Sequence, residues 1–204
     1  MLPDHLGDTA AGRVVVAHLG NGASLCAMRQ RRSVETSMSF TPLDGIPMSS
    51  RCGALDPGVL LYLLREDGMT PAQLDDLLHH RSGLLGVSGF SGDVRTLLES
   101  NDPHAAEALD LFAYRTAQAI AGHAVALEGL DALVFTAGIG EHAAPVRAAI
   151  CRQLTWLGLT LDEAANARHG PRISRADSRI SAWVIPTNEE KVIAQHAWAL
   201  TAGT

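Results

Sequence analysis

Several short segments of the sequence carry residue types that could hold and transfer a phosphate group. A glycine-rich hairpin such as Gly20-Asn21-Gly22 exposes backbone amides that phosphate oxygens can approach closely. Arg51 offers a planar guanidinium, which can clamp a phosphoryl group and neutralise the charge that develops on it. Asp93-Val94-Arg95 could set one acceptor and one donor against a ligand, and Gly138-Ile139-Gly140-Glu141 follows a strand, where open α/β sheets bind ligands. Glu189 or Glu190 could offer a carboxylate to magnesium, which takes only one or two protein ligands.

Each of these segments also has an ordinary structural explanation. The Asn21-Gly22 pair is typical of a type I′ hairpin turn, which is the explanation we favour on that pair alone. Arg51 fits a surface loop, Asp93 to Arg95 fit a helix start with a local ion pair, and Gly138 to Gly140 fit a tight strand-to-helix turn. Carboxylates such as Glu189 and Glu190 are stabilised at a helix N-terminus by the helix dipole. The motif G-x-x-x-x-G-K-[ST] is absent, so no single segment decides the function.

The composition predicts one globular domain and excludes several classes of protein. The chain has 204 residues, of which 47% are hydrophobic and 19% charged, which is ample for one buried core. Its net charge of −6 argues against a non-specific nucleic-acid binder or a protein of anionic membranes. The three cysteines form no CxxC pair, no apolar run reaches the ~20 residues of a membrane span, and no signal sequence is evident. We therefore expect a cytoplasmic protein.

The hydrophobic periodicity predicts elements that would position these segments. Strands are expected at 14–17, 23–28, 33–36, 133–136 and 180–185, the first three as an antiparallel meander. Helices are expected at 57–66, at 71–80, from Asp102-Pro103 onwards, after Gly140 to about Leu157, and from Asn188 to about Leu200. We expect loops at 37–55 and 82–92, an irregular surface insertion at 162–178 and a ragged lead-in at 1–12. This order predicts an α/β sheet with one antiparallel side.

The order of the motifs resembles that of the acetate kinase family, over roughly residues 13–200. The runs that carry the resemblance are His18-Leu19-Gly20-Asn21-Gly22-Ala23-Ser24, Glu35-Thr36-Ser37-Met38-Ser39-Phe40-Thr41-Pro42-Leu43-Asp44-Gly45, Asp56-Pro57-Gly58, Gly86-Val87-Ser88-Gly89-Phe90-Ser91-Gly92-Asp93-Val94-Arg95, Phe135-Thr136-Ala137-Gly138-Ile139-Gly140-Glu141 and Ile185-Pro186-Thr187-Asn188-Glu189-Glu190. The family belongs to the superfamily of acetate and sugar kinases, heat-shock chaperones and actin.

The resemblance implies a fold, an activity and a domain division. Residues 13–204 are expected to form a ribonuclease-H-like β-β-β-α-β-α-β-α domain with a mixed sheet and helical insertions, which is the C-terminal, nucleotide-binding domain of the family. Residues 1–12 are then a lead-in remnant, and the family's N-terminal domain is absent. The implied reaction is ATP-dependent phosphorylation of acetate to acetyl phosphate, with Mg²⁺ as cofactor and ATP or ADP as substrate. Because the acetate site lies in the absent domain, we expect the isolated chain to be inactive. The alternatives are a propionate or other short-chain carboxylate kinase, and a non-catalytic nucleotide-binding or dimerisation module.

The resemblance also implies roles for individual residues. Arg51 would stabilise the transition state, Glu189 would bind magnesium, and the chain would form a homodimer. The residues implied to contact the adenine nucleotide are His18, Leu19, Gly20, Asn21, Gly22, Asp93, Val94, Arg95, Gly138, Ile139, Gly140, Glu141 and His142. The chain departs from the family's pattern at Ala54, where an acidic residue is usual, and at His142, where asparagine is usual.

Overall fold

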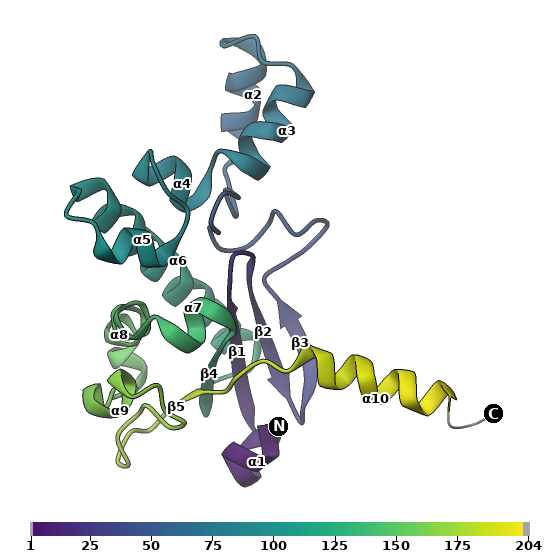
Figure 1. The fold of residues 1–204 in the computed structure, drawn as a ribbon, viewed down its shortest axis with the longest axis vertical. Coiled ribbons are helices and arrows are strands. Elements are labelled where there is room, and N and C mark those ends of the chain that lie inside the picture. Colours follow the sequence, from purple (N-terminus) through teal and green to yellow (C-terminus); the bar gives the residue numbers. More distant parts are fainter. Residues whose placement is uncertain (1, 202–204) are drawn as a thin grey trace.

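A five-stranded mixed sheet, in the order β3-β2-β1-β4-β5, forms the centre of the molecule in the computed structural model (Figure 1). The structure describes residues 2–201; in the last helix it describes the side chains of 190, 194, 196–198, 200 and 201. The strands are β1 (Arg13–Leu19), β2 (Ala23–Arg29), β3 (Arg32–Thr36), β4 (Ala132–Thr136) and β5 (Ser181–Val184). The first three are antiparallel, β4 is parallel to β1 and β5 is parallel to β4. The predicted meander and the ribonuclease-H-like order of elements are confirmed.

The longer helices form where the periodicity and the capping residues predict them. They are α2 (Pro57–Arg65), α3 (Pro71–His80), α6 (Pro103–Ala126), α8 (Ala144–Gln153) and α10 (Glu189–Thr201). Three of them begin with proline after a capping side chain: Asp56 accepts from the Gly58 amide, Thr70 from the Gln73 amide and Asp102 from the His104 amide. Each cap satisfies an amide that the helix itself leaves without a partner, which fixes where the helix starts.

Three segments expected to be irregular contain short helices, so these predictions are wrong. Within the predicted lead-in at 1–12, residues 2–11 form α1 (Leu2–Leu6) and the 3₁₀ helix η1 (Gly7–Ala11), with Leu6 and Ala10 buried against the sheet. The predicted loop at 82–92 contains α4 (Gly83–Ser88), and the predicted insertion at 162–178 contains α9 (Glu163–Ala167). Helices of five or six residues span fewer than two turns, so they carry too little periodicity to be recognised in the sequence.

The hairpin at Gly20 to Gly22 exists, but its predicted turn type is wrong. Leu19 pairs with Ala23, so the connection has three residues, and neither Asn21 nor Gly22 has a positive φ. The left-handed pair expected of a type I′ turn occurs instead between β2 and β3, at Gln30 (φ 53°) and Arg31 (φ 62°). The Asn21-Gly22 pair therefore predicts the hairpin correctly but not its backbone conformation.

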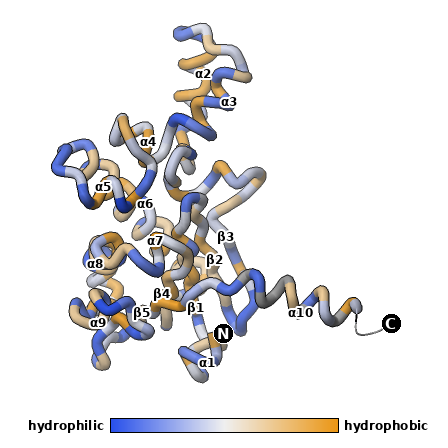
Figure 2. The backbone as a smooth tube through the Cα atoms, in the orientation of Figure 1, coloured by the Kyte–Doolittle hydropathy of each residue, from blue (hydrophilic) through white to orange (hydrophobic). Residues whose placement is uncertain are grey.

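The two faces of the sheet are covered differently. On β1, Val15, Ala17 and Leu19 point into the main core, which α6 and α8 cover, while Val14 packs with α1 on the other face. This alternation is the period of two that a strand imposes. Figure 2 shows the hydrophobic colours gathered on the central strands and on the outlying helix α2. No helix among residues 2–201 is long and apolar enough to cross a membrane.

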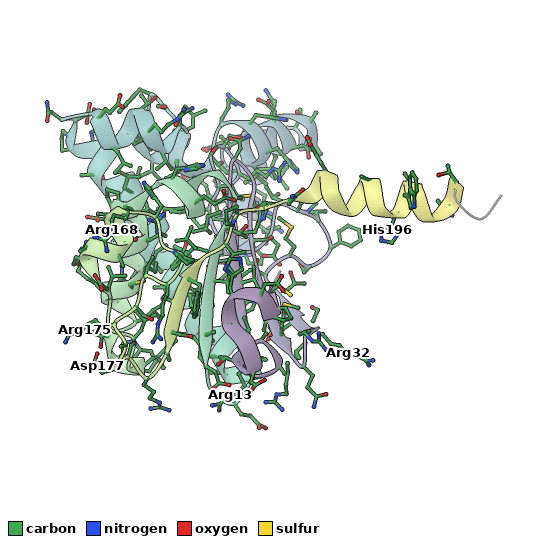
Figure 3. The ribbon with its side chains drawn as sticks, turned by 60° about the horizontal axis from the view of Figure 1, so that its bottom comes forward. Arg13, Arg32, Arg168, Arg175, Asp177 and His196 are labelled. Carbon is green, nitrogen blue, oxygen red and sulfur yellow. The ribbon has the colours of Figure 1, made fainter. Side chains whose placement is uncertain are left out.

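An ion pair fastens the end of the sheet at which β1 begins. The Asp131 carboxylate accepts from the backbone amide of Arg13 at 2.8 Å and from its Nε at 3.0 Å, and Arg13 lies at the lower edge of Figure 3. The hydrogen bond from the Arg13 side chain lowers the pKa of Asp131, so the carboxylate stays ionised at neutral pH. A Cβ at Gly12 would lie 2.7 Å from this carboxylate, so the pair needs glycine beside it. The candidate functional site lies at the opposite end of β1.

Candidate functional site

A cleft of about 910 Å³ opens at the carboxyl ends of β1 and β4. Its volume lies in the range of small-molecule sites. The cleft is bounded by the β1–β2 hairpin, the loop at Ser49 and Ser50, α4, the short helix α5 (Val94–Glu99) and the short helix α7 (Ala137–His142). The predicted nucleotide contacts that line it are Gly20, Asn21, Asp93, Val94, Arg95, Gly138, Ile139 and His142.

The parallel pairing of β1 with β4 brings two of the predicted segments together. His18 pairs with Thr136, so the hairpin tip and the start of α7 leave the sheet side by side. A Cβ built at Gly20 would lie 3.6 Å from the Cβ of Ala137. Ala137 itself has φ 65°, a left-handed conformation that is uncommon outside glycine and is often found at functional sites. Ligands of open α/β sheets bind at this edge.

Several predicted residues stand behind the cleft wall instead of lining it. Leu19 is fully buried in the main core and Gly140 is buried within α7. His18 lies on the opposite face of β1 from Ala17 and Leu19, because side chains alternate along a strand. Gly22 faces the arginine loop, since a Cβ there would lie 3.5 Å from Nη1 of Arg51. The hairpin therefore offers the cleft mainly its tip.

The Glu141 carboxylate holds two segments together. Its Oε1 accepts from the backbone amides of Ala137 and Thr187, both at 2.9 Å. The Thr187 hydroxyl lies 2.6 Å from that of Thr136, which closes the same junction. Thr187 precedes α10, which starts at Glu189. Glu141 thus holds the start of α7 against the segment that leads into α10. Its carboxylate does not line the cleft, but it helps to fix the position of α7, which does.

Backbone hydrogen bonds fix the loop that carries Arg51. The Ser49 amide donates to the Asn21 carbonyl at 3.3 Å, and the Ser49 carbonyl accepts from the Leu85 amide of α4 at 2.9 Å. The Arg51 guanidinium donates to the Pro42 carbonyl at 3.3 Å and, among the described residues, forms no ion pair with a carboxylate. The loop therefore places the guanidinium of Arg51, without a carboxylate partner among the described residues, beside the hairpin tip. Arg51 does not itself line the cleft.

Gly92 makes this arrangement possible, which leads to a first prediction. A Cβ at Gly92 would lie 2.5 Å from the Ser49 carbonyl oxygen, so Gly92→Ala must displace the arginine loop. We expect roughly tenfold weaker binding of the implied nucleotide, ADP, in a calorimetric titration. Gly122 in α6 is the matched control, because a Cβ there meets nothing within 4 Å. Gly122→Ala should keep the affinity and raise the free energy of unfolding by about 0.5–1 kcal/mol. Equal ADP affinity in both variants would show that the loop position does not matter.

The α5 side of the cleft supplies both polar and apolar groups. Asp93 caps α5 by accepting from the Arg95 amide at 2.8 Å, and this hydrogen bond lowers the pKa of Asp93. The structural explanation, a helix start with a local ion pair, is thus correct: Nη2 of Arg95 lies 3.4 Å from Oδ2 of Asp93, and the Arg95 side chain is 88% exposed at the cleft. Sequence reasoning did not single out Phe90 and Leu98, which also line the cleft and are 46% and 38% exposed. The only signal was an aromatic residue flanked by glycines in the run from Gly89 to Gly92.

The predicted magnesium ligand can be located only by its backbone. Glu189 opens α10, and its side chain lies outside the described residues. Among the described side chains, no three His, Cys, Asp or Glu groups come close enough together to hold a metal ion. Magnesium bound to nucleotide phosphates needs only one or two protein carboxylates, so a single ligand at the start of α10 is compatible with this chain.

Comparison with known proteins identifies relatives across nearly the whole chain. Residues 4–195 match the family model described as the acetokinase family. The acetate kinase of Rhodopseudomonas palustris strain TIE-1 is 60% identical over 205 residues, which is 99% of this chain, and that of Nitrobacter hamburgensis is 54% identical over 199 residues. The crystal structure of Porphyromonas gingivalis acetate kinase superposes with a TM-score of 0.91 at 33% identity, covering 98% of this chain and 52% of that one. A propionate kinase from Francisella tularensis superposes with a TM-score of 0.87 at 37% identity, covering 94% of this chain and 52% of that one.

The chain spans about half the length of the curated relatives it matches. It covers 52% of the Rhodopseudomonas protein and 49% of the Nitrobacter protein. The high TM-scores nevertheless extend over almost all of its own residues, so it corresponds to one folded half of those molecules.

Proposed function

The chain belongs to the acetokinase family, and from this we propose that it is the nucleotide-binding half of a cytoplasmic enzyme that phosphorylates acetate with ATP. The observation that carries the proposal is the cleft, which gathers three segments that lie far apart in the sequence. The hairpin tip at Gly20, the turn at Gly138 and the α5 start at Asp93 all line it. The family resemblance predicts a nucleotide contact at each of these segments, and their meeting at one sheet edge is what a shared ligand requires.

The cleft offers different chemistry along its length. Leu85, Phe90 and Leu98 provide apolar and aromatic surface against which a purine base can pack. Gly20 and Gly138 leave backbone amides open to the phosphates, since neither has a side chain in the way. Arg51 lies beyond the hairpin tip, next to Gly22. A nucleotide with its base near α5 and its phosphates at the hairpin would point its γ-phosphoryl group toward this arginine.

The reaction that we propose is an in-line phosphoryl transfer. A carboxylate oxygen of acetate forms a bond to the γ-phosphorus while the bond to the bridging oxygen of ADP breaks, which yields acetyl phosphate and ADP. Catalysis of such transfers comes from positioning and from neutralisation of charge on the phosphoryl oxygens. Arg51 is suited to the second task because no carboxylate among the described residues already neutralises it. The glycine turns hold the donor in place.

The proposed reaction also requires a magnesium ion at the nucleotide phosphates. When bound, it neutralises charge on the phosphates of the nucleotide. Glu189 would hold it from the start of α10, and Glu141 contributes by fixing Thr187, two residues before that glutamate.

Two alternatives lead to different outcomes in experiments. A propionate kinase is among the structural relatives, so propionate or another short carboxylate could be the acceptor. A non-catalytic nucleotide-binding or dimerisation module would bind ADP without ever supporting turnover. The non-catalytic module differs from the proposed kinase in what happens when the other half of the molecule is supplied, whereas the choice of acceptor is set by that other half.

The test compares the 204-residue chain with a fused enzyme, in which this chain replaces the matching half of the Rhodopseudomonas palustris acetate kinase. We expect the chain alone to bind ADP and to form no acyl phosphate, because orientation of the acceptor supplies about 7–11 kcal/mol in such reactions. The fused enzyme should form acetyl phosphate, measured by hydroxamate trapping with acetate. Turnover by the chain alone would disprove the half-enzyme proposal, and a fused enzyme that binds ADP without turnover would favour the non-catalytic module.

We also propose that the chain forms a homodimer. No residue of α2 is buried, and its exposed side chains include Leu61 and Tyr62, at 49% and 58% exposure. Such an apolar helix surface is typical of an interface. Sedimentation at micromolar concentration should give twice the chain mass of 21.6 kDa. The variant Leu61→Glu should sediment as a monomer, whereas Val125→Glu, which changes an exposed valine on α6, should not alter the mass. A wild-type monomer would contradict this proposal.

A further inference from the structure

The molecule contains a fully buried arginine that the proposed reaction does not use. Arg147 in α8 has no exposed surface, although arginine is seldom buried without a charged partner. Among the described residues it forms no ion pair with a carboxylate. Burial lowers the pKa of Arg147 to about 10, so its guanidinium still carries a positive charge at neutral pH.

Neutral acceptors satisfy every N–H group of this guanidinium. Nη1 donates to the carbonyls of Gly140 and Glu141, both at 2.9 Å. Nε donates to Oδ1 of Asn166 at 2.8 Å, and Nη2 to the Asn166 carbonyl at 2.8 Å and to Nδ1 of His169 at 3.1 Å. Arginine has five such donors in a rigid fork, and all five are used here. The side chain therefore has one fixed geometry.

The acceptors on one side of the fork belong to the cleft wall. Gly140 and Glu141 lie in the last turn of α7, where helix carbonyls lack partners within the helix and a cation is favourable. The same short helix presents Gly138, Ile139 and His142 to the cleft. A second connection runs through His169, whose ring stands edge-on to that of His142 at 6.2 Å between centroids.

The acceptors on the other side are Asn166 in α9 and His169 just after it, in the stretch predicted to be an irregular insertion. Asn166 is 97% buried, since only 3% of its surface is exposed, and its Nδ2 donates to the Ala144 carbonyl at 2.9 Å. It thus holds both Arg147 and the start of α8. Figure 1 shows α7 beside the sheet, with α8 to its left and α9 below α8. Behind the cleft wall, a polar connection therefore runs from α7 through Arg147 to α9, beside the apolar packing of the core.

We infer that Arg147 is a positioning residue for the ligand of the cleft, setting the place of α7 so that Gly138, Ile139 and His142 face the bound molecule. The inference rests on the proposed function only for the identity of that ligand, an adenine nucleotide. Lysine cannot replace the fork, since its single nitrogen cannot reach both the α7 carbonyls and Asn166.

The experiment measures ADP affinity and amide hydrogen exchange on the 204-residue chain. The variants are Arg147→Met, Arg147→Lys and Asn166→Ala, each studied well below its own unfolding midpoint. We expect Arg147→Met to weaken ADP binding by roughly 10- to 100-fold and to speed exchange at residues 138–143. Arg147→Lys should restore part of both properties, and Asn166→Ala should change both in the same direction to a smaller extent. Arg152→Met is the matched control, because Arg152 is exposed on the same helix, and it should behave as the wild type.

The outcomes separate positioning from simple stabilisation. If Arg147 only stabilises the fold, the variants will unfold at lower temperature while ADP affinity and exchange at 138–143 stay at wild-type values, which would overturn the inference. If Arg147→Met does not fold, Arg147→Lys and Asn166→Ala decide the question by the same two measurements. If the wild-type chain binds no ADP, the proposed function fails, and the exchange at 138–143 alone then decides whether Arg147 positions α7.

Discussion

Replacing Arg51 by alanine in the fused enzyme should lower the turnover number by about 10³- to 10⁵-fold while ADP affinity changes little. The reason is positional. Arg51 lies beside Gly22 at the hairpin tip and does not line the cleft, so it should interact with the γ-phosphoryl group during transfer more strongly than with bound ADP. The measurement is steady-state kinetics with saturating ATP and acetate, together with calorimetry for ADP.

Two further variants define what the arginine supplies. Arg51→Lys keeps the charge but loses the planar fork, so its turnover should fall between those of the wild type and the alanine variant. Arg168→Ala removes an exposed arginine that follows α9, labelled in Figure 3, and should leave turnover unchanged. If Arg51→Ala weakens ADP binding as strongly as it lowers turnover, the residue binds the ground state and our assignment is wrong.

Glu189→Gln in the fused enzyme should raise the magnesium concentration needed for half-maximal rate by roughly 10- to 100-fold. Glu190→Gln is the matched control, because both residues lie in the first turn of α10 and should gain equally from the helix dipole. Only Glu189 occupies the position that the family resemblance assigns to the metal. The measurement is the rate as a function of Mg²⁺ concentration at fixed ATP. Equal shifts in the two variants would mean that these carboxylates serve only to stabilise the helix start.

The sequence was sufficient for the strands and for the helices that have clear caps. The β1–β2–β3 meander follows from alternating apolar residues, and α3 follows from the capping residue Thr70 and the proline after it. These signals are local, so they survive without knowledge of the tertiary structure. The same holds for two of the cleft segments, the hairpin at Gly20 and the turn at Gly138, which meet at one sheet edge once β4 is known to lie parallel to β1.

The features that could not be predicted depend on contacts between distant parts of the chain. Gly83 adopts φ 59° and starts α4 because its backbone packs directly on the loop at Met48, where a Cβ would come within 2.1 Å of the carbonyl oxygen. No local pattern around residue 83 announces that contact. Likewise, Arg147 looks like an ordinary helical arginine in sequence, and only the fold shows that it is buried between α7 and Asn166. The residue spacing could not reveal its role because its partners lie on separate elements.

The same reasoning explains why predicted nucleotide contacts divide into two groups. Gly20 directly follows β1 and Gly138 lies in the first turn of α7, two residues beyond β4, and both line the cleft. Leu19, which precedes Gly20, is buried in the core. Glu141, three residues after Gly138, instead accepts hydrogen bonds from the amides of Ala137 and Thr187. A motif marks the neighbourhood of a site, whereas the strand alternation and the side-chain partners decide which of its members can touch a ligand.

The most direct test of this account is amide hydrogen exchange of the 204-residue chain with and without ADP and Mg²⁺. The account predicts that the nucleotide slows exchange at residues 20–22, 91–95 and 138–142 together, because these segments line a single cleft. It also predicts no protection around Arg172 and Arg179, which line a separate cavity beside α1. Protection confined to that second cavity, or no protection anywhere at saturating ADP, would contradict the claim that this chain is the nucleotide-binding half of a kinase.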